Sequence, residues 1–192
     1  MKKSLIILTL VFINNLFFGQ SEAKIIIPID SITQKYTYTK IIEVPDKNAS
    51  DLFLSTKKWC IQKYLNDKFI IEETDSKLIY IGNFPINTVI KVLGRNAPQA
   101  FTVLFSLTTL FKNGKCKVEL SNFKLTQNSQ GTTNERTLEA YNKNVESYNR
   151  TGKKYIRLER DSIFNEVDSN AKKILLDLEK ELKGENQSKK EW

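Results

Sequence analysis

The sequence has no histidine and only two cysteines among its 192 residues. Without histidine, the chain cannot build a Ser-His-Asp triad, a Cys-His catalytic pair or a metal site with imidazole ligands. The two cysteines are also too few for a zinc site made of four thiolates. The composition therefore excludes several large classes of hydrolase and metalloprotein, and we expect no catalytic residues, no metal and no cofactor.

The two cysteines, Cys60 and Cys116, fall on the apolar sides of a predicted helix and a predicted strand, which would bring them into one core. Two alternatives are open. A disulfide would close a long loop and contribute about 4 kcal/mol in the chain-entropy model, whereas two free thiols would act as small buried hydrophobic groups. Free thiols are favoured, because Cα atoms in a helix layer and a sheet are often further apart than the about 7 Å that a disulfide permits.

A concentrated run of one charge is also missing. Lysine and arginine outnumber aspartate and glutamate by 30 to 22, giving a net charge of +8, but the basic residues are scattered among acidic ones. Proteins that bind nucleic acids instead gather arginine and lysine along the phosphate backbone. The charge favours solubility and weak attraction to polyanions such as lipopolysaccharide, and we expect no nucleic acid partner.

Long apolar runs are confined to the N-terminus. Residues 1–20 join a basic start, Lys2-Lys3, to a short apolar stretch and a small or polar end at Gly19-Gln20. This is the layout of a secretory signal peptide cleaved beside Gly19 or Gln20; the alternative is an uncleaved N-terminal anchor. No later segment reaches the ~20 apolar residues of a membrane helix. We expect no transmembrane segment in the mature chain and a periplasmic or extracellular location in a Gram-negative bacterium.

Residues 101–123 predict a two-stranded ribbon that turns at Asn113-Gly114, because this dipeptide tolerates the positive φ angles of a type I′ turn. Closing the ribbon there places Leu107 opposite Leu120 on an apolar side, which we expect to be buried beneath helices. The other side is more polar, with a few apolar exceptions. It carries Leu104, Leu110, Lys117 and Phe123.

The other elements follow from apolar periodicity and turn residues. Before the ribbon we expect a strand at residues 36–44 and a helix at residues 48–66. Two further strands are expected at residues 69–74 and 77–84. Gly82 indicates a bulge or a bend in the last of these strands. We expect residues 85–99 to form a loop, with an optional short strand at 89–92. After the ribbon, the polar residues 124–134 predict a mobile connection.

Apolar residues at helical spacing continue from Leu138 to Tyr148 and again, more regularly, from Ile163 to about Lys183. Two C-terminal helices are therefore expected. The predicted organisation is a single domain at residues 36–183. Within it, residues 36–124 form a core of strands and one helix, and residues 135–183 form the C-terminal helices. Residues 184–192 are predicted to be a polar tail.

Several of these segments, taken in order and spacing, resemble a known family. They are residues 38–44, Leu52 with Trp59, residues 77–84 and the hairpin at 111–123. The family is one of secreted bacterial domains of unknown function with a TATA-binding-protein-like fold. The resemblance implies an α+β fold with a single curved antiparallel sheet of about five strands, in β-α-β-β-β-β-α order, and helices packed on one face. It supplies no catalytic residues, and the likeness to the TATA-binding protein is one of shape, which does not imply function.

If the helices cover the side of Leu107, the opposite sheet face is left open and half apolar. We interpret its residues Leu104, Leu110, Lys117 and Phe123 as a candidate docking surface for a partner protein or a second copy of the chain. The alternative is that residues 124–149 fold back over this face. The acidic groups at 72–75 and at Glu159 with Asp161 match no metal-binding loop and are expected to be solvated surface charges.

The favoured function is an exported, non-enzymatic binding or scaffolding module of the bacterial cell envelope, whose partner is an unknown envelope protein or the chain itself. One alternative is an enzyme that acts on glycans with carboxylates alone, which would need two facing carboxylates in a deep pocket. The other is a carrier of an apolar ligand, which would need a sizeable cavity between the helix layer and the sheet.

Overall fold

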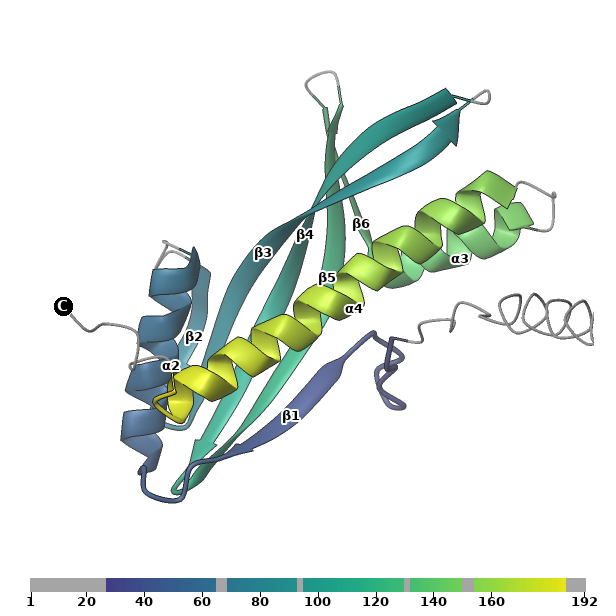
Figure 1. Ribbon diagram of the computed structural model, residues 1–192. Helices are drawn as coiled ribbons and strands as arrows, with labels where there is room; N and C mark the ends of the chain where they lie inside the picture. Colours follow the sequence, from purple (N-terminus) through teal and green to yellow (C-terminus); the bar gives the residue numbers. More distant parts are fainter. Residues whose placement is uncertain (1–26, 65–68, 93–94, 130–131, 150–153, 186–192) are drawn as a thin grey trace, which may run out of the picture.

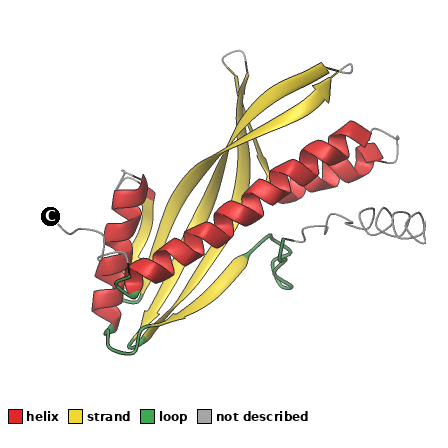
Figure 2. Cartoon of the chain, in the orientation of Figure 1, coloured by secondary structure: helices red, strands yellow, loops and turns green. Residues whose placement is uncertain are grey.

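The computed structural model describes residues 27–64, 69–92, 95–129, 132–149 and 154–185. In these residues, a six-stranded antiparallel sheet carries three helices (Figures 1 and 2). The strands are β1 (Tyr38–Glu43), β2 (Ile70–Thr74), β3 (Lys77–Val92), β4 (Arg95–Lys112), β5 (Lys115–Ser129) and β6 (Thr132–Thr137), and the helices are α2 (Ala49–Tyr64), α3 (Leu138–Asn149) and α4 (Lys154–Leu182). The predicted α+β fold with one antiparallel sheet is confirmed, with six strands in place of about five.

The strand order is β1-β5-β4-β3-β2, and β6 pairs with β5 beyond the part that pairs with β1. Helices α2 and α4 lie on one face of the sheet, and α3 runs beside the N-terminal half of α4 (Figure 1). The core lies between these helices and the sheet. It includes Leu78, Tyr80, Val103, Leu107, Val118 and Leu120 from the strands and Leu52, Cys60, Val167 and Leu178 from the helices.

The ribbon made by β4 and β5 has the predicted register around its turn. Leu107 pairs with Leu120, and their side chains are 1% and 0% exposed. The predicted turn type is wrong, however, because only Gly114 has a positive φ (78°) and Asn113 does not, which is the sign pattern of a type II turn. The Asn113 side chain instead contacts the start of a helix, since its Oδ1 accepts a hydrogen bond of 3.0 Å from the backbone N–H of Ala49, the first residue of α2.

The expected loop at 85–99 is wrong, since β3 and β4 continue through it and pair from Lys77–Leu110 to Val92–Arg95. Two prolines make this stretch look irregular in the sequence. Pro85 lies where β2 has already ended, and Pro98 lies beyond Thr102, where β4 no longer pairs with β5. A proline is tolerated in a strand when its nitrogen faces an edge that needs no ladder hydrogen bond.

The expected mobile connection at 124–134 is also wrong. Its described residues, 124–129 and 132–134, belong to the end of β5 and to β6, which pair from Lys124–Thr137 to Ser129–Thr132. Because the described side chains of β6 are exposed, this strand has none of the apolar alternation by which a half-buried strand is recognised. The arms β3–β4 and β5–β6 diverge beyond the Thr102–Thr126 pair (Figure 1).

Gly82 causes no bulge, because β3 pairs with β4 without a register shift. It pairs directly with Phe105, whose ring occupies the space that a side chain at position 82 would fill. Register shifts occur elsewhere in the sheet. One lies in the β2–β3 pair between Ile70 and Glu72, and the other lies in the β4–β5 pair between Leu104 and Ser106, where Asn122 of β5 has a φ of 54°.

Both cysteines are buried free thiols, Cys60 on α2 and Cys116 on β5. Burial raises the pKa of Cys60 to about 12 and the pKa of Cys116 to about 11. Both side chains therefore stay protonated in the folded chain near neutral pH and pack as small hydrophobic groups.

Candidate functional site

The sheet face turned away from the helices carries the residues predicted as a docking surface. On this face, Leu110 of β4 lies between Lys77 of β3 and Lys117 of β5, and Lys117 in turn lies opposite Ile41 of β1. Leu110 is 43% exposed, Ile41 is 61% exposed and Lys117 is also exposed. The structure therefore brings Leu110 and Lys117 together in one row, as expected, and adds Ile41.

Leu104 lies on the same face, between Asn83 and Lys124, and is partly buried. Ile79 and Ile81 of β3 also belong to this face, because they alternate with the core residues Leu78 and Tyr80. Sequence reasoning missed Ile41, Ile79 and Ile81. The signal was present in the period-2 alternation of β1 and β3.

The prediction that Phe123 lies on the sheet face turned away from the helices was wrong. Its side chain is 0% exposed and packs edge to face on Tyr38, with ring centroids 6.0 Å apart, and against Phe105 at 6.4 Å. The cause is the bulge at Asn122. An extra residue in one strand reverses the alternation beyond it, so Phe123 turns into the core while Asn122 is exposed.

Charged and hydroxyl groups surround the apolar side chains of the open face. Lys77 forms an ion pair of 2.8 Å with Glu72 of β2, and Lys117 lies 3.9 Å from Glu119. Thr108 and Ser106 continue the face between Leu110 and Leu104. We call this surface, made of Ile41, Ile79, Ile81, Leu104, Leu110 and Lys117, the open face. It combines apolar area with satisfied charges, as a protein-docking surface requires.

The segment that follows β5 does not fold back over the open face in its described parts. β6 extends the sheet sideways by pairing with β5, and α3 packs against α4 through buried residues that include Leu138, Tyr141 and Val145. The alternative that residues 124–149 cover this face was therefore wrong for that part of the chain.

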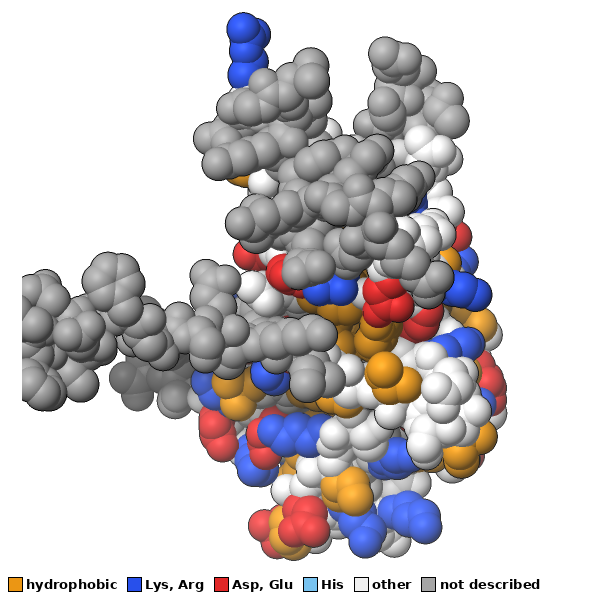
Figure 3. Space-filling model, turned by 90° about the vertical axis from the view of Figure 1, so that its right-hand side faces the viewer, with side chains coloured by type: hydrophobic (Ala, Val, Ile, Leu, Met, Phe, Trp, Pro, Cys, Tyr) orange, Lys and Arg blue, Asp and Glu red, His pale blue; other side chains and the backbone are white. Residues whose placement is uncertain are grey.

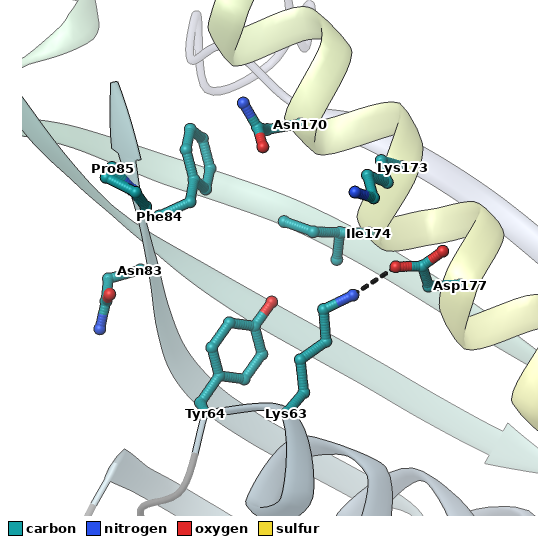
Figure 4. A pocket seen from close by; sticks show the side chains of 9 residues that line it. All are labelled: Lys63, Tyr64, Asn83, Phe84, Pro85, Asn170, Lys173, Ile174 and Asp177. Atoms are coloured by element: carbon teal, nitrogen blue, oxygen red, sulfur yellow. Dashed lines mark hydrogen bonds and ion pairs between the residues drawn. The ribbon is translucent and has the colours of Figure 1, made fainter. Parts of the chain in front are cut away.

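A second feature is a pocket of about 410 Å³ between the C-terminal end of α2, the strand β3 and the helix α4 (Figure 4). The rings of Tyr64 and Phe84 and the side chain of Ile174 give it apolar walls. Its polar lining comes from Lys63, Asn83, Asn170, Lys173 and Asp177. No residue of this pocket was predicted as a site, because three elements far apart in the sequence build it and no short motif marks it.

Most of the charge in this pocket is already paired. Lys63 forms an ion pair with Asp177 across the gap between α2 and α4, and its Nζ also lies 5.0 Å from the centre of the Trp59 ring. Asp177 is the single carboxylate among the lining residues. A hydrolytic mechanism with two carboxylates flanking a glycosidic bond has no second partner in this lining.

Glu159 on α4 corrects the expectation that the group with Asp161 is fully solvated. Asp161 is bound by the Arg160 guanidinium at 2.6 Å, but Glu159 is partly buried. Burial raises the pKa of the Glu159 carboxyl above its usual value, against the opposing effects of the Tyr141 hydroxyl and the Arg136 cation. The carboxyl is thus less stable as an anion in the folded protein than in the unfolded chain.

We expect Glu159→Gln to stabilise the protein more at pH 7 than at pH 4. An acid whose pKa is raised by folding stabilises the fold while it is protonated, and that contribution is lost as the pH rises from below the unfolded pKa through the higher folded one. A neutral glutamine keeps this stabilising contribution at both pH values. Urea unfolding at the two pH values measures the change, with Glu166→Gln, at an exposed position of α4, as the control. Equal effects of Glu159→Gln at both values would contradict the prediction.

The charges seen on one side of the molecule are mixed. In Figure 3, lysine and arginine side chains alternate with aspartate and glutamate, and hydrophobic side chains lie between them. None of the described helices is long and apolar enough to span a membrane. Within the described residues, no three cysteine, aspartate or glutamate side chains gather in a way that could hold a metal ion.

Comparisons with known proteins agree with this architecture. A crystal structure of a DUF4468 family protein from Bacteroides ovatus superposes with a TM-score of 0.60 at 17% identity, covering 80% of this chain and 90% of that one. A TBP-like protein from Parabacteroides distasonis superposes with a TM-score of 0.57 at 9% identity, covering 81% of this chain and 96% of that one. At these identities the likeness shows the fold alone. Among curated proteins, none matches the chain.

The sequence itself matches a family model over residues 38–126, which run from the start of β1 through most of β5. The matched segment contains all of the segments on which the resemblance was based, including the hairpin at Asn113-Gly114. Residues 38–126 of the chain match the family described as a domain of unknown function (DUF4468) with a TBP-like fold.

Proposed function

We propose that the protein is an exported, non-enzymatic binding module of the bacterial cell envelope, and that it binds a partner protein through the open face. The observation that carries the proposal is the exposure of Leu110 and Ile41 in one row across β4, β5 and β1, on the face away from the helices. Apolar side chains with hydroxyls and paired charges around them are the composition of a protein-docking surface. The export part rests on residues 1–20, with their basic start and apolar stretch.

The pocket supports this proposal over the enzyme alternative. Its one carboxylate, Asp177, is engaged by Lys63, so this site offers no pair of carboxyl groups for general acid-base catalysis. The same pocket also supports the binding module over a carrier of an apolar ligand. Five of its nine lining residues are polar or charged, whereas an apolar ligand needs a mainly apolar wall.

The experiment is a comparison of Leu110→Ser with Leu176→Ser. Both leucines are about equally exposed, at 43% and 45%, but Leu110 lies on the open face and Leu176 on α4. Tagged chains are recovered from the native envelope, and the co-purifying proteins and the mature N-terminus are identified by mass spectrometry. We expect Leu110→Ser to reduce recovery of the partner by about tenfold, the equivalent of one well-placed contact, and Leu176→Ser to leave it unchanged.

Ile41→Ser provides an independent variant on the neighbouring edge of the same face. If both open-face variants recover the same proteins as the unmodified chain, the open face is not the docking surface. If the unmodified chain is a dimer that Leu110→Ser converts to a monomer, the occupant is a second copy of the chain and the partner-protein assignment is wrong. Light scattering of the purified chains distinguishes these results.

A further inference from the structure

The pocket between α2, β3 and α4 lies on the helix side of the sheet, away from the open face (Figure 4). Its volume of about 410 Å³ falls in the lower part of the range for small-molecule sites, about 300–1,000 Å³. The ring of Tyr64 and the side chains of Phe84 and Ile174 face one another across it (Figure 4). The site therefore has the size of a small-molecule site and combines apolar walls with polar groups.

The polar groups that remain available in this pocket are both donors and acceptors. Asn170 uses its Nδ2 to donate to the carbonyl of Glu166 at 2.8 Å, which leaves its Oδ1 as an acceptor. Lys173 is exposed, and within the described residues no carboxylate forms an ion pair with it. Asn83 also lines the pocket from β3, but its amide points away from the cavity (Figure 4).

The electrostatics of the pocket disfavour a strongly anionic ligand. Lys63 is neutralised by Asp177, so Lys173 is the cation in the lining that has no described carboxylate partner. The helix that ends at the pocket, α2, turns its C-terminal end toward it with Lys63 and Tyr64. The C-terminal end of a helix carries partial negative charge, whereas phosphate sites use helix N-termini and arginines.

We propose that this pocket binds a neutral saccharide unit, which it holds without cleaving it. Each sugar hydroxyl both donates and accepts hydrogen bonds, which suits the Asn170 amide and the Lys173 ammonium group at the edge of this pocket. The C–H faces of a sugar ring pack on the electron-rich faces of aromatic rings, and the partly exposed ring in this pocket is that of Tyr64, with the buried Phe84 beside it. With one carboxylate, already bound to Lys63, the lining holds a sugar but has no pair of acids to hydrolyse its glycosidic bond.

The test is an NMR titration of the isotope-labelled full chain with maltose, cellobiose and N,N′-diacetylchitobiose, with inorganic phosphate as the anionic probe. We expect at least one disaccharide to cause saturable shifts of the backbone amides of Tyr64, Phe84 and Ile174. Asn170→Ala should raise its Kd about tenfold, as loss of one ligand hydrogen bond does. The matched control is Asn165→Ala, at an exposed position of α4 outside the pocket, and it should leave the Kd unchanged.

Three results would overturn the inference. The first is that none of the disaccharides shifts these amides, and the second is that Asn170→Ala binds as tightly as the unmodified chain. The third is that phosphate binds more tightly than every disaccharide. Chromatography of the sugar after incubation tests the absence of cleavage, and release of monosaccharide would refute that part. None of these results depends on Leu110 or Ile41, so the pocket and the open face stand or fall separately.

Discussion

Replacing Gly82 with valine is expected to destabilise the protein by about 3 kcal/mol, at the upper end of the usual cost of overpacking a core. A Cβ atom at position 82 would lie 2.8 and 2.9 Å from Cε1 and Cε2 of Phe105, and closer still to Cζ. The ring has little room to move, because it also packs against Phe84 at 5.8 Å and Tyr64 at 5.9 Å between centroids. Urea unfolding measures the loss.

A double-mutant cycle identifies the cause of this loss. In a Phe105→Leu background the side chain opposite position 82 is smaller, so the cost of Gly82→Val should fall by at least half if the ring is the obstacle. Valine is otherwise well suited to a strand, so no other penalty is expected at this position. A cost that is the same in both backgrounds would show that the contact between Gly82 and Phe105 is not responsible.

Phe123→Ala is expected to cost about 3–5 kcal/mol of unfolding free energy, the range for removal of a buried phenylalanine ring. The side chain is fully buried and packs against the rings of Tyr38 and Phe105. Leu110→Ala, on the open face, should stay within about 0.5 kcal/mol, as surface substitutions usually do. Thermal and urea unfolding of the two variants test the difference.

This pair of variants also tests where the bulge places β5. If Phe123 pointed to the open face, as a strict alternation from Leu120 would require, its removal would change stability little and would weaken partner recovery instead. A small loss of stability for Phe123→Ala would therefore contradict the bulge at Asn122. A large loss for Phe123→Ala together with an unchanged stability for Asn122→Gly would support it, because glycine accepts a positive φ without strain.

The elements with strong apolar periodicity were predictable from the sequence. The pairing of Leu107 with Leu120 and the helix that begins after Asn48 followed from local signals, because alternation and capping are properties of neighbouring residues. The strand β6 was missed, since its described side chains are exposed and leave no apolar pattern. Pro85 and Pro98 hid the half of the β3–β4 pair nearest its turn for a different reason, because proline argues against a central strand.

The candidate surfaces were predictable only in part, for two physical reasons. Phe123 was misplaced because one residue in the left-handed region, Asn122, reverses every side chain after it, and an asparagine does not by itself mark such a site. The pocket was missed because Tyr64, Phe84 and Asn170 become neighbours only when α2 and α4 pack on the sheet. Leu110 and Lys117 were placed correctly because they lie between the turn and the bulge, and Leu104 because the extra residue is in β5 and leaves the alternation of β4 intact.

The hydrogen bond from the Ala49 N–H to Asn113 gives the hairpin turn a second role. It spans a sequence separation of 64 residues, and Gly114 and Lys47 reinforce it through a backbone bond of 2.8 Å from the Gly114 N–H to the Lys47 carbonyl. A helix start needs its first N–H groups satisfied, and here part of that satisfaction comes from the far end of the ribbon. The first turn of α2 and the reversal between β4 and β5 therefore form one cooperative unit, in which neither is complete until the other is in place.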